Sequence, residues 1–267
     1  MTRRRLDTEL VRRGLASSRA EAQEAVRAGL VLVAGSPATK AATLVADDQP
    51  VTVSAPARRF ASRGGDKLDA ALARFSVDPR GLDCLDAGAS TGGFTDRLLR
   101  GGASRVIAVD VGYGQLAWAL RTDERVAVME RVNVRDLRLE TLAFVPDLVV
   151  ADLSFISLRT VLPVLAAISS PLASFVALVK PQFEAGPADV GSGGVVRSPT
   201  VWRRVLDEVL AATEESGIVP VGVMASPVRG PAGNVEFLLH GRKSGQPAEV
   251  SSSDLDAAIA EGELVAG

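Results

Sequence analysis

The sequence has almost none of the residues on which redox and zinc chemistry depend. Its 267 residues include one cysteine, Cys84, and one histidine, His240. One cysteine cannot form an internal disulfide, and one cysteine with one histidine cannot build a Cys/His zinc site. Both residues stand in apolar runs, so we expect Cys84 to pack within a strand and His240 to fill the core or to end a strand at solvent. We therefore predict no metal, and acid–base chemistry must depend on lysine, carboxylates or tyrosine.

Aromatic residues and long apolar runs are also scarce. Aromatics make up 4% of the chain, too few for a base-stacking platform built on many rings. No apolar run approaches the roughly 18 residues that a membrane-spanning helix needs. The N-terminus is basic, but no apolar segment follows it as in a secretory signal. With 47% hydrophobic and 23% charged residues, the chain is expected to be a globular cytoplasmic protein without membrane contact.

Charge is divided unevenly along the chain. Residues 1–67 contain 12 Lys/Arg and 7 Asp/Glu, whereas the remaining residues contain 18 and 25. The first segment therefore carries a net charge of +5 and the rest −7, which together give the overall −2. This distribution indicates a polyanion-binding module attached to a second domain.

The first 57 residues are expected to form a small α+β domain. Residues 6–11 have helical spacing, and a second helix begins with a capping box at residues 18–21. Strand-like runs follow at residues 30–33 and 51–53, with turn-forming residues between them.

The order of these residues resembles a known RNA-binding domain. Residues 6–19, followed by 29–35, are similar to the domain of ribosomal protein S4 that pseudouridine synthases and tyrosyl-tRNA synthetases share. The resemblance implies that arginines contact RNA phosphates and position RNA without reading its sequence. A solvated helical face is the alternative interpretation. The candidates are Arg3, Arg4, Arg5, Arg12, Arg13, Arg19 and Arg27, with Arg63 added from the start of the second domain.

A second domain is expected from residue 62 to residue 267, after a linker at residues 58–61. Proline and small residues within residues 55–61 break both periodicities there. Strand-like and helical segments alternate there, for example with helices at 157–168 and 200–216. This alternation predicts a doubly wound, mainly parallel, Rossmann-like α/β sheet of seven strands. The expected strands are 82–86, 105–110, 126–130, 147–152, 175–180, 219–224 and 235–240. Ligands of such sheets bind beyond the carboxyl ends of the strands.

A glycine-rich turn, Asp-Ala-Gly-Ala-Ser-Thr-Gly-Gly-Phe at residues 86–94, follows the first of these strands. Its spacing differs from the G-x-G-x-x-G of nicotinamide sites. Asp86 opens the turn, and Asp110 ends the next strand. Carboxylates at these points can accept hydrogen bonds from ribose hydroxyls, disfavour a pyrophosphate and suit the cationic end of S-adenosylmethionine. We therefore predict S-adenosylmethionine as the cofactor, with a plain structural turn as the alternative.

The residues expected around this methyl donor lie in three loops. Asn133 follows the third strand, where adenine is expected, and Asp136 is a second candidate; both could equally cap the loop. The predicted donor residues are Asp86, Gly88, Ser90, Thr91, Gly92, Phe94, Asp110 and Asn133.

Four further polar residues predict a site for the chemistry: Lys67, Asp152, Lys180 and Glu236. The last three stand at strand ends and are expected to meet at one edge of the sheet, with Lys67 joining from the preceding helix. A methyl donor is already activated, so the protein must align the acceptor hydroxyl and remove its proton. Lysines become effective bases near neutral pH when burial and a second cation act on them, an arrangement that Lys180 beside Lys67 would provide. Two ordinary salt bridges are the alternative. The loop at residues 152–155 lacks the prolines of base amino-methylases, which counts against base N-methylation.

These four residues match the Lys-Asp-Lys-Glu tetrad of FtsJ-related ribose 2′-O-methyltransferases. The chain from about residue 4 to residue 242 resembles the TlyA family, also known as hemolysin A. The resemblance implies 2′-O-methylation of cytidines in 16S and 23S rRNA within 30S and 50S subunits, and sensitivity to capreomycin and viomycin. Phe60 stands where related chains often have tryptophan, and the tail after residue 241 matches no motif, although residues 251–261 suggest a capped surface helix. The motifs that carry the resemblance are residues 86–94, 110–116, 151–158, 178–184 and 225–236.

Three other functions stay open at this point. A pseudouridine synthase could share the RNA-binding module, but its catalytic aspartate motif is not evident. A membrane-lytic toxin would need a spanning or strongly amphipathic apolar segment, and none is visible. A non-catalytic RNA-binding protein is the remaining alternative, and the sequence leaves the oligomeric state open.

Overall fold

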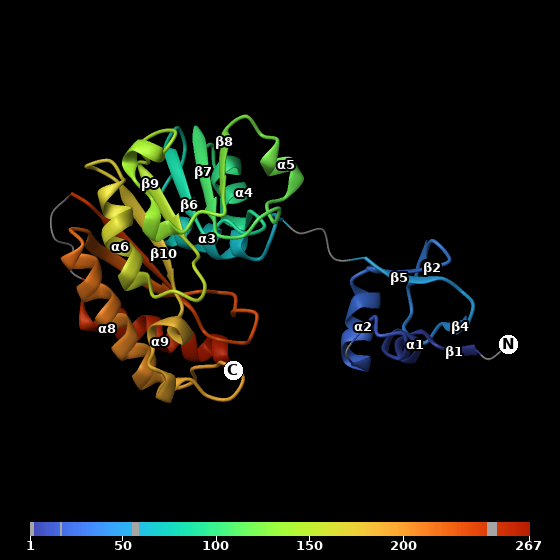
Figure 1. The fold of residues 1–267 in the computed structure, drawn as a ribbon. Helices are drawn as coiled ribbons and strands as arrows, with labels where there is room; N and C mark the ends of the chain where they lie inside the picture. The colour runs from blue at the N-terminus through green and yellow to red at the C-terminus, as the bar shows by residue number, and fades with distance from the viewer. Residues whose placement is uncertain (1–2, 17, 55–58, 245–249) are drawn as a thin grey trace. The chain divides into compact units, whose positions relative to one another are not determined.

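The computed structural model describes residues 3–16, 18–54, 59–244 and 250–267. The chain divides into two compact units, Met1–Arg58 and Arg59–Gly267 (Figure 1). Residues 55–58, which contain the expected domain boundary and the first residue of the expected linker, lie outside the described residues. The linker assignment therefore stays a prediction, and each unit is described by itself.

Among the described residues of the N-terminal unit, two helices, α1 (Leu6–Arg12) and α2 (Arg19–Arg27), accompany five short strands. The hydroxyl of Ser18 caps α2 by accepting a hydrogen bond from the Glu21 backbone N–H at 3.2 Å. Apolar side chains from both helices and from the strands form one small core, which accounts for the helical periodicity of the sequence. The strands are β1 (Arg3–Arg5), β2 (Val31–Val33), β3 (Ser36–Pro37), β4 (Leu44–Ala46) and β5 (Val51–Val53).

Two small antiparallel sheets complete this unit. β1 pairs with β4, and β2 pairs with both β3 and β5. The α+β character predicted for the unit is confirmed. The strand β1 was not predicted, because three consecutive arginines have no strand-like pattern and their partner β4 is about forty residues away in the sequence.

The second unit is built on a seven-stranded sheet with the order β11-β12-β10-β9-β6-β7-β8. The strands β6 to β10 run parallel, whereas β12 runs antiparallel to both of its neighbours. The predicted doubly wound, mainly parallel fold is therefore confirmed. The strands are β6 (Asp83–Ala87), β7 (Arg105–Asp110), β8 (Val126–Glu130), β9 (Leu148–Ala151), β10 (Ser174–Val179), β11 (Val219–Ala225) and β12 (Phe237–Arg242).

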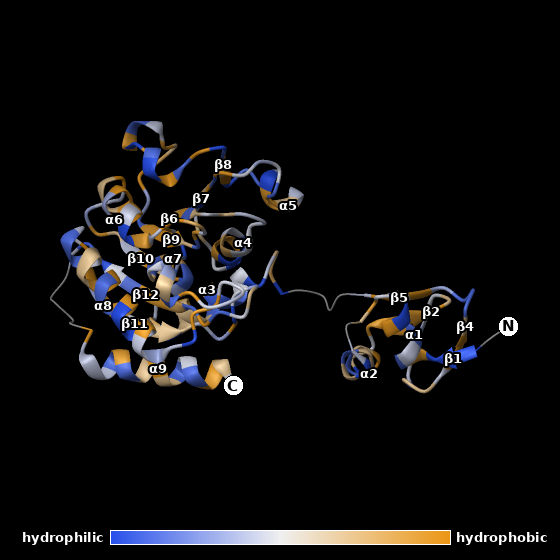
Figure 2. Cartoon of the chain, turned by 60° about the horizontal axis from the view of Figure 1, so that its bottom comes forward, coloured by the Kyte–Doolittle hydropathy of each residue, from blue (hydrophilic) through white to orange (hydrophobic). Residues whose placement is uncertain are grey.

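Helices cover both faces of this sheet, as a sheet with apolar residues on both sides requires. The helices α3 (Gly64–Arg74), α4 (Gly93–Arg100) and α5 (Trp118–Arg121) contribute to one apolar layer. The helices α6 (Leu158–Ala167), α8 (Pro199–Glu215) and α9 (Ser252–Ala266) contribute to the other. The strands are apolar along much of their length, whereas α8 and α9 alternate apolar and polar residues (Figure 2). Shorter helical turns are α7 (Pro181–Glu184), η1 (Val134–Asp136), η2 (Leu139–Thr141) and η3 (Pro187–Asp189).

The unusual residues singled out in the sequence lie in this framework. Cys84 is buried in β6, and burial raises the pKa of its thiol to about 12, so the thiol stays protonated. His240 is buried in β12 and stacks on Phe75. Ser251 caps α9, which begins as predicted but continues to Ala266 and buries Leu255. None of the helices described is long and apolar enough to cross a membrane.

Candidate active site

The glycine-rich turn after β6 packs directly against the loop after β9. Gly88 has a positive φ of +90°, and a Cβ on it would lie 2.5 Å from the carbonyl oxygen of Asp152. The backbone N–H of Asp152 in turn donates to the carbonyl of Ala87 at 2.9 Å. A side chain at residue 88 is therefore excluded both by backbone conformation and by space.

Asp110 connects this turn to the loop after β7. Its Oδ2 accepts a hydrogen bond from the Ser90 backbone N–H at 2.8 Å, and its Oδ1 accepts one from Gly112 at 2.7 Å. Each oxygen keeps a second lone pair for a ligand. The carboxylate thus stands between two loops at the carboxyl ends of β6 and β7.

A hollow of about 540 Å³ lies at this edge of the sheet. Its walls come from the loops after β6, β7 and β8, which the sequence predicted for the methyl donor, and from the loop after β9, which it predicted for the chemistry. The described residues that line it are Gly88, Ser90, Asp110, Val111, Gln115, Asn133, Val134, Arg135, Asp152, Leu153, Ser154, Phe155 and Ile156.

Asp86 lies beneath the turn and outside this lining. It is fully buried, its Oδ2 accepts a hydrogen bond from the Thr95 hydroxyl at 2.7 Å, and its Oδ1 has no partner among the described residues. Burial raises the pKa of Asp86 to about 7. A carboxyl group in this place supports the turn from below, so its direct contact with a ligand, expected from sequence, stays a prediction.

The other predicted donor residues divide between the hollow and the core. Asn133 lines the hollow and also caps η1, because its Oδ1 accepts from the Arg135 backbone N–H at 3.1 Å. Phe94 is buried in the apolar layer, and Gly92, with a φ of +95°, packs on Leu116 and Leu120. Two further donor candidates, Thr91 and Asp136, are exposed outside the lining, as is Arg63, which was predicted to contact RNA.

The predicted tetrad forms two lysine–carboxylate pairs. The Nζ of Lys180 lies 2.6 Å from Asp152 Oδ1 and donates to Ser154 Oγ at 3.0 Å. Lys67, on α3, forms a buried ion pair with Glu236. Asp152 and Ser154 line the hollow, so the Lys180 pair reaches the hollow through them.

The antiparallel strand β12 explains how Glu236 comes to this edge. Val179 of β10 pairs with Phe237 of β12. Lys180 follows Val179, and Glu236 precedes Phe237, so Lys180 and Glu236 occupy neighbouring backbone positions. A Cβ on Gly64, at the start of α3, would lie 3.6 Å from Asp152 Oδ2, which places the first turn of α3 at the same edge. The two pairs therefore lie at one edge of the sheet, which supports the prediction of one site.

Phe155 and Arg135 also belong to this site, although the sequence did not assign a role to either. The side chain of Phe155 is 91% exposed, which is unusual for a large aromatic residue, and its ring centroid lies 5.2 Å from that of Phe183. An exposed ring at the rim of the hollow can stack on an unpaired base, and an arginine can contact a phosphate. The signal in the sequence was an aromatic residue in the loop that follows Asp152.

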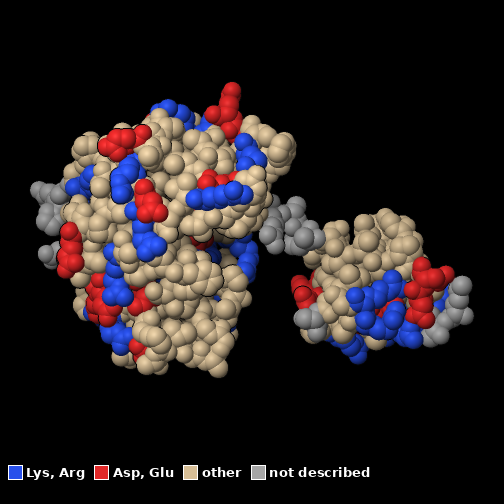
Figure 3. Space-filling view, viewed as in Figure 1, with Lys and Arg blue, Asp and Glu red and all other residues tan. Residues whose placement is uncertain are grey.

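The predicted RNA-binding arginines take up several environments. In the N-terminal unit, Lys and Arg side chains gather over α1 and β1 (Figure 3). Arg5 and Arg19 form ion pairs with Asp7, and Arg12 and Arg13 form ion pairs with Glu9. Arg3 and Arg4 lie in β1, and Arg27 pairs with Glu24 at 2.7 Å.

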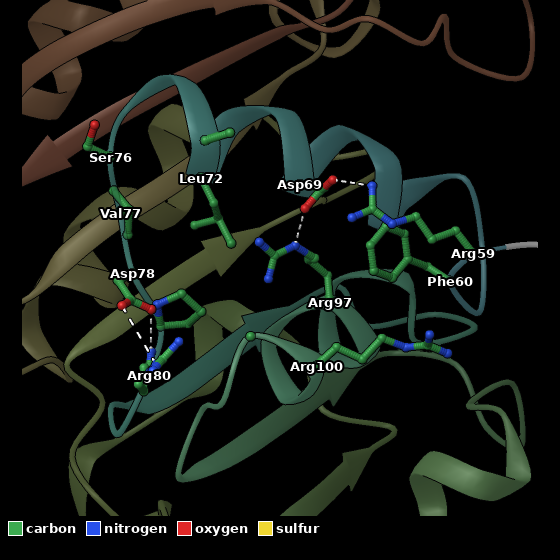
Figure 4. A pocket seen from close by; sticks show the side chains of 13 residues that line it. Arg59, Phe60, Asp69, Leu72, Ser76, Val77, Asp78, Arg80, Arg97 and Arg100 are labelled. Carbon is green, nitrogen blue, oxygen red and sulfur yellow. Dashed lines mark hydrogen bonds and ion pairs between the residues drawn. The ribbon is translucent and has the colours of Figure 1, made fainter.

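A larger hollow of about 700 Å³, lined by residues of α3 and α4, contains none of the predicted catalytic or donor residues (Figure 4). Asp69 bridges Arg59 and Arg97 there, at 2.5 Å from each. The ring of Phe60 is buried, with the guanidinium of Arg59 4.9 Å and that of Arg100 5.7 Å from its centroid. By size alone this larger hollow would be the candidate active site, but the predicted catalytic and donor residues favour the smaller hollow.

The strand order, the antiparallel β12 and the glycine-rich turn after β6 define a methyltransferase of the Rossmann-like class. Residues 60–243 match the FtsJ-like methyltransferase family, and residues 4–50 match the S4 domain. The chain belongs to the TlyA family of FtsJ-like methyltransferases, because it is similar to members of that family over most of its length.

Two relatives and one solved structure cover most of the chain. The 16S/23S rRNA (cytidine-2′-O)-methyltransferase TlyA of Mycobacterium tuberculosis is 54% identical over 238 residues, 89% of each chain. Hemolysin A of Brachyspira hyodysenteriae is 38% identical over 237 residues, 88% of this chain and 98% of its own. A solved structure from Streptococcus thermophilus, named as a hemolysin, has a TM-score of 0.77 and 39% identity over 99% of this chain and 97% of its own.

Proposed function

We propose that the chain transfers the methyl group of S-adenosylmethionine to the ribose 2′-hydroxyl of cytidines in 16S and 23S rRNA within 30S and 50S subunits. The observation that carries this proposal is the Lys180–Asp152 pair at the rim of the donor hollow. The names of the relatives support the substrate, and the N-terminal S4 domain supports RNA as the partner. Action on ribosomes also implies a cytoplasmic location and sensitivity of the cell to capreomycin and viomycin.

The residues around the hollow fit S-adenosylmethionine. Two carboxylates in the lining, Asp110 and Asp152, suit a ligand that carries a sulfonium and an ammonium group. Gly88 allows the ligand to approach the backbone closely, and Asp110 can accept hydrogen bonds from ribose hydroxyls. Asn133 stands where adenine would contact the loop after β8. The buried Asp86 Oδ1, which has no partner in the described part of the chain, leaves an acceptor under the same turn for a ligand group or a water.

The chain's own residues would then align the acceptor and take its proton. S-adenosylmethionine supplies an activated methyl group when it is bound. Lys180, as a free amine, would accept the proton of the 2′-hydroxyl, since its Nζ already lies within hydrogen-bond distance of Ser154 and Asp152 at the rim. Asp152 would stabilise the ammonium that forms. The buried pair of Lys67 and Glu236 would hold the neighbouring wall in place.

A direct transfer assay tests this function. The purified chain is incubated with methyl-labelled S-adenosylmethionine and unmodified 30S or 50S subunits, and the products are mapped by ribose-methylation-sensitive primer extension. We expect label on cytidine ribose in both subunits. Label on a base would overturn the ribose mechanism, and absence of label in both subunits would overturn the substrate.

A further inference from the structure

Two carboxylates on α1, those of Asp7 and Glu9, have 0% of their side-chain surface exposed. Aspartate and glutamate are almost never fully buried unless they are paired. Neither residue lies in the unit that carries the predicted tetrad, so methyl-transfer chemistry does not account for them. Their surroundings consist largely of arginines.

Asp7 is held by donors from two other segments, β1 and α2. Arg5 donates to it twice, from Nε at 3.1 Å and from Nη2 at 2.9 Å. Arg19 Nη2 donates at 3.1 Å and Gln23 Nε2 at 3.0 Å, both from α2. The Arg5 guanidinium, with Gln23 and Arg19, holds the pKa of Asp7 well below its usual range. The carboxylate is therefore a fixed negative charge that draws β1 and α2 together.

Glu9 holds two neighbouring arginines, Arg12 at the end of α1 and Arg13 directly after it. Arg12 donates from Nε at 2.8 Å and from Nη2 at 2.5 Å, and Arg13 Nε donates at 2.6 Å. Arg13 also donates to backbone carbonyls within residues 46–49. The guanidiniums of Arg12 and Arg13 lower the pKa of Glu9 to about 2.

The arginines on these carboxylates nevertheless face solvent. The side chains of Arg5, Arg12 and Arg19 are 46%, 49% and 58% exposed. A guanidinium has five N–H donors, and two of them suffice for a bidentate bond to one carboxylate. Arg5 and Arg12 each use Nε and one Nη2 hydrogen in this way. Arg12 Nη2 also lies 3.7 Å from Asp47 Oδ1, and the other N–H groups of the two guanidiniums can donate to a phosphate.

We propose that Asp7 and Glu9 are positioning residues for RNA binding, which hold these arginines in the arrangement that contacts the RNA backbone. The proposal rests on the RNA-binding function proposed above. A free arginine must lose much of its side-chain freedom when it binds a phosphate, whereas an arginine already fixed on a buried carboxylate has lost it before the RNA arrives.

A positioning role predicts the opposite change in RNA affinity from the change that net charge alone predicts. Removing one negative charge from a polyanion-binding unit would, by long-range electrostatics, strengthen RNA binding. If Glu9 positions Arg12, the Glu9→Gln variant should instead bind RNA about tenfold more weakly, because an ordered cation becomes a mobile one. The slope of log K against log salt should also become shallower, since fewer phosphates are neutralised by fixed contacts.

Equilibrium binding of the full chain to an rRNA fragment, at several salt concentrations, separates these cases. The matched control is Glu24→Gln, which makes the same charge change at an exposed carboxylate paired with an exposed Arg27. We expect this control to bind as tightly as the unsubstituted chain or slightly more tightly. Binding of Glu9→Gln that equals or exceeds that of Glu24→Gln would overturn the positioning role.

A double-mutant cycle distinguishes positioning from general damage to the fold. In an Arg12→Ala background, Glu9→Gln should lower the RNA affinity by less than about threefold, because the arginine through which Glu9 acts is gone. A loss of the full size in that background would overturn the proposal. Arg12→Lys keeps Glu9 and the net charge but loses the bidentate bond, so we expect this variant to bind RNA more weakly as well. Undiminished RNA binding by Arg12→Lys would contradict the positioning role. Failure of the unsubstituted chain to bind RNA would overturn the RNA-binding function as well.

Discussion

Lys180 Nζ lies 2.6 Å from Asp152 Oδ1, and this contact joins the end of β10 to the loop after β9 at the rim of the donor hollow. The same nitrogen donates to Ser154 Oγ at 3.0 Å. The ion pair orients the lysine, but only an amine that can lose its proton can act as the base for a ribose hydroxyl. Orientation and proton transfer are therefore separable by substitution.

Lys180→Arg should keep the ion pair and lose the activity. Arginine stays charged at every accessible pH and cannot accept a proton. We expect kcat for methyl transfer to fall by about 10²–10⁴-fold, the size of a general-base effect, with little change in the affinity for S-adenosylmethionine. Labelled-methyl transfer to ribosomal subunits and calorimetric binding of the donor measure the two quantities.

Lys67→Arg makes the same change at the other lysine of the predicted tetrad, whose partner Glu236 lies outside the lining of the hollow. We expect it to retain more activity than Lys180→Arg. Full activity of Lys180→Arg would contradict the assignment of the base, and an equal loss in both variants would make the two lysines one functional unit.

Asp86 should make the stability of the second unit depend on pH. Burial raises its pKa from an ordinary 3.8 to about 7 in the folded chain. The unfolded carboxyl therefore ionises first as pH rises, so its contribution to stability is greatest below about pH 4 and is lost by about pH 7. The change is on the order of a few kcal/mol, because one pKa unit corresponds to about 1.4 kcal/mol.

Asp86→Asn should remove this dependence while keeping the shape of the side chain. Urea unfolding followed by tryptophan fluorescence reports on the second unit, since Trp118 and Trp202 both lie there. Burial lowers the pKa of His240 to about 4, so this residue makes stability rise with pH over part of the range from 4 to 7. Because His240 is present in both proteins, its effect cancels when their pH profiles are compared. Identical pH profiles of the two proteins between pH 4 and 7 would contradict the buried, protonated state of Asp86.

The sequence was sufficient to predict the sheet and the loops, because alternation of strands and helices and the ends of parallel strands follow from local patterns. It was harder to predict whether the side chain of each motif residue faces the hollow or the core. Asp86 ends a strand beside a glycine-rich turn, yet its side chain points to Thr95 beneath the turn. Phe94 belongs to the same motif and lies in the core. Both outcomes depend on how α4 packs, which no local pattern contains.

The N-terminal arginines show a similar limit. Their spacing suggested a basic face, and a solvated helix was the alternative. The buried carboxylate of Asp7 depends on Arg5 of β1 and Arg19 of α2. Arg13, which pairs with Glu9, also donates to the carbonyl of Gln49 in the turn before β5. Long-range contacts of this kind decide whether an arginine is mobile or fixed, and they are absent from the periodicity of the sequence.

Gly88→Ala should weaken binding of S-adenosylmethionine. A Cβ at this position would meet the carbonyl oxygen of Asp152 at 2.5 Å, so the turn must move away from the loop that carries half of the Lys180 pair. We expect at least about a tenfold loss of donor affinity, since ligand sites tolerate displacements of well under 1 Å.

Gly217→Ala is the control for backbone strain. Gly217 also has a positive φ, +76°, but a Cβ on it would meet nothing within 4 Å. We expect it to cost about 1 kcal/mol of stability and to bind the donor normally in calorimetry. Equal donor binding by both variants would show that the contact of Gly88 with Asp152 does not shape the hollow.

Phe155→Ala should lose transfer to the ribosomal subunit while keeping the donor site. The ring is 91% exposed, so its removal leaves the core intact. Stacking of a base on an aromatic ring is worth about 1–3 kcal/mol, which corresponds to a fall in kcat/KM for the subunit of about five- to a hundredfold. Phe155→Tyr should retain most of the activity because it keeps the ring.

Leu172→Ala removes another exposed apolar side chain, 78% exposed, from the same unit but away from the hollow. It should leave kcat/KM unchanged, which separates stacking from a general effect of surface hydrophobicity. Donor binding should be the same in all three variants. If Phe155→Ala methylates the subunit at the unsubstituted rate, the exposed ring does not hold the target base.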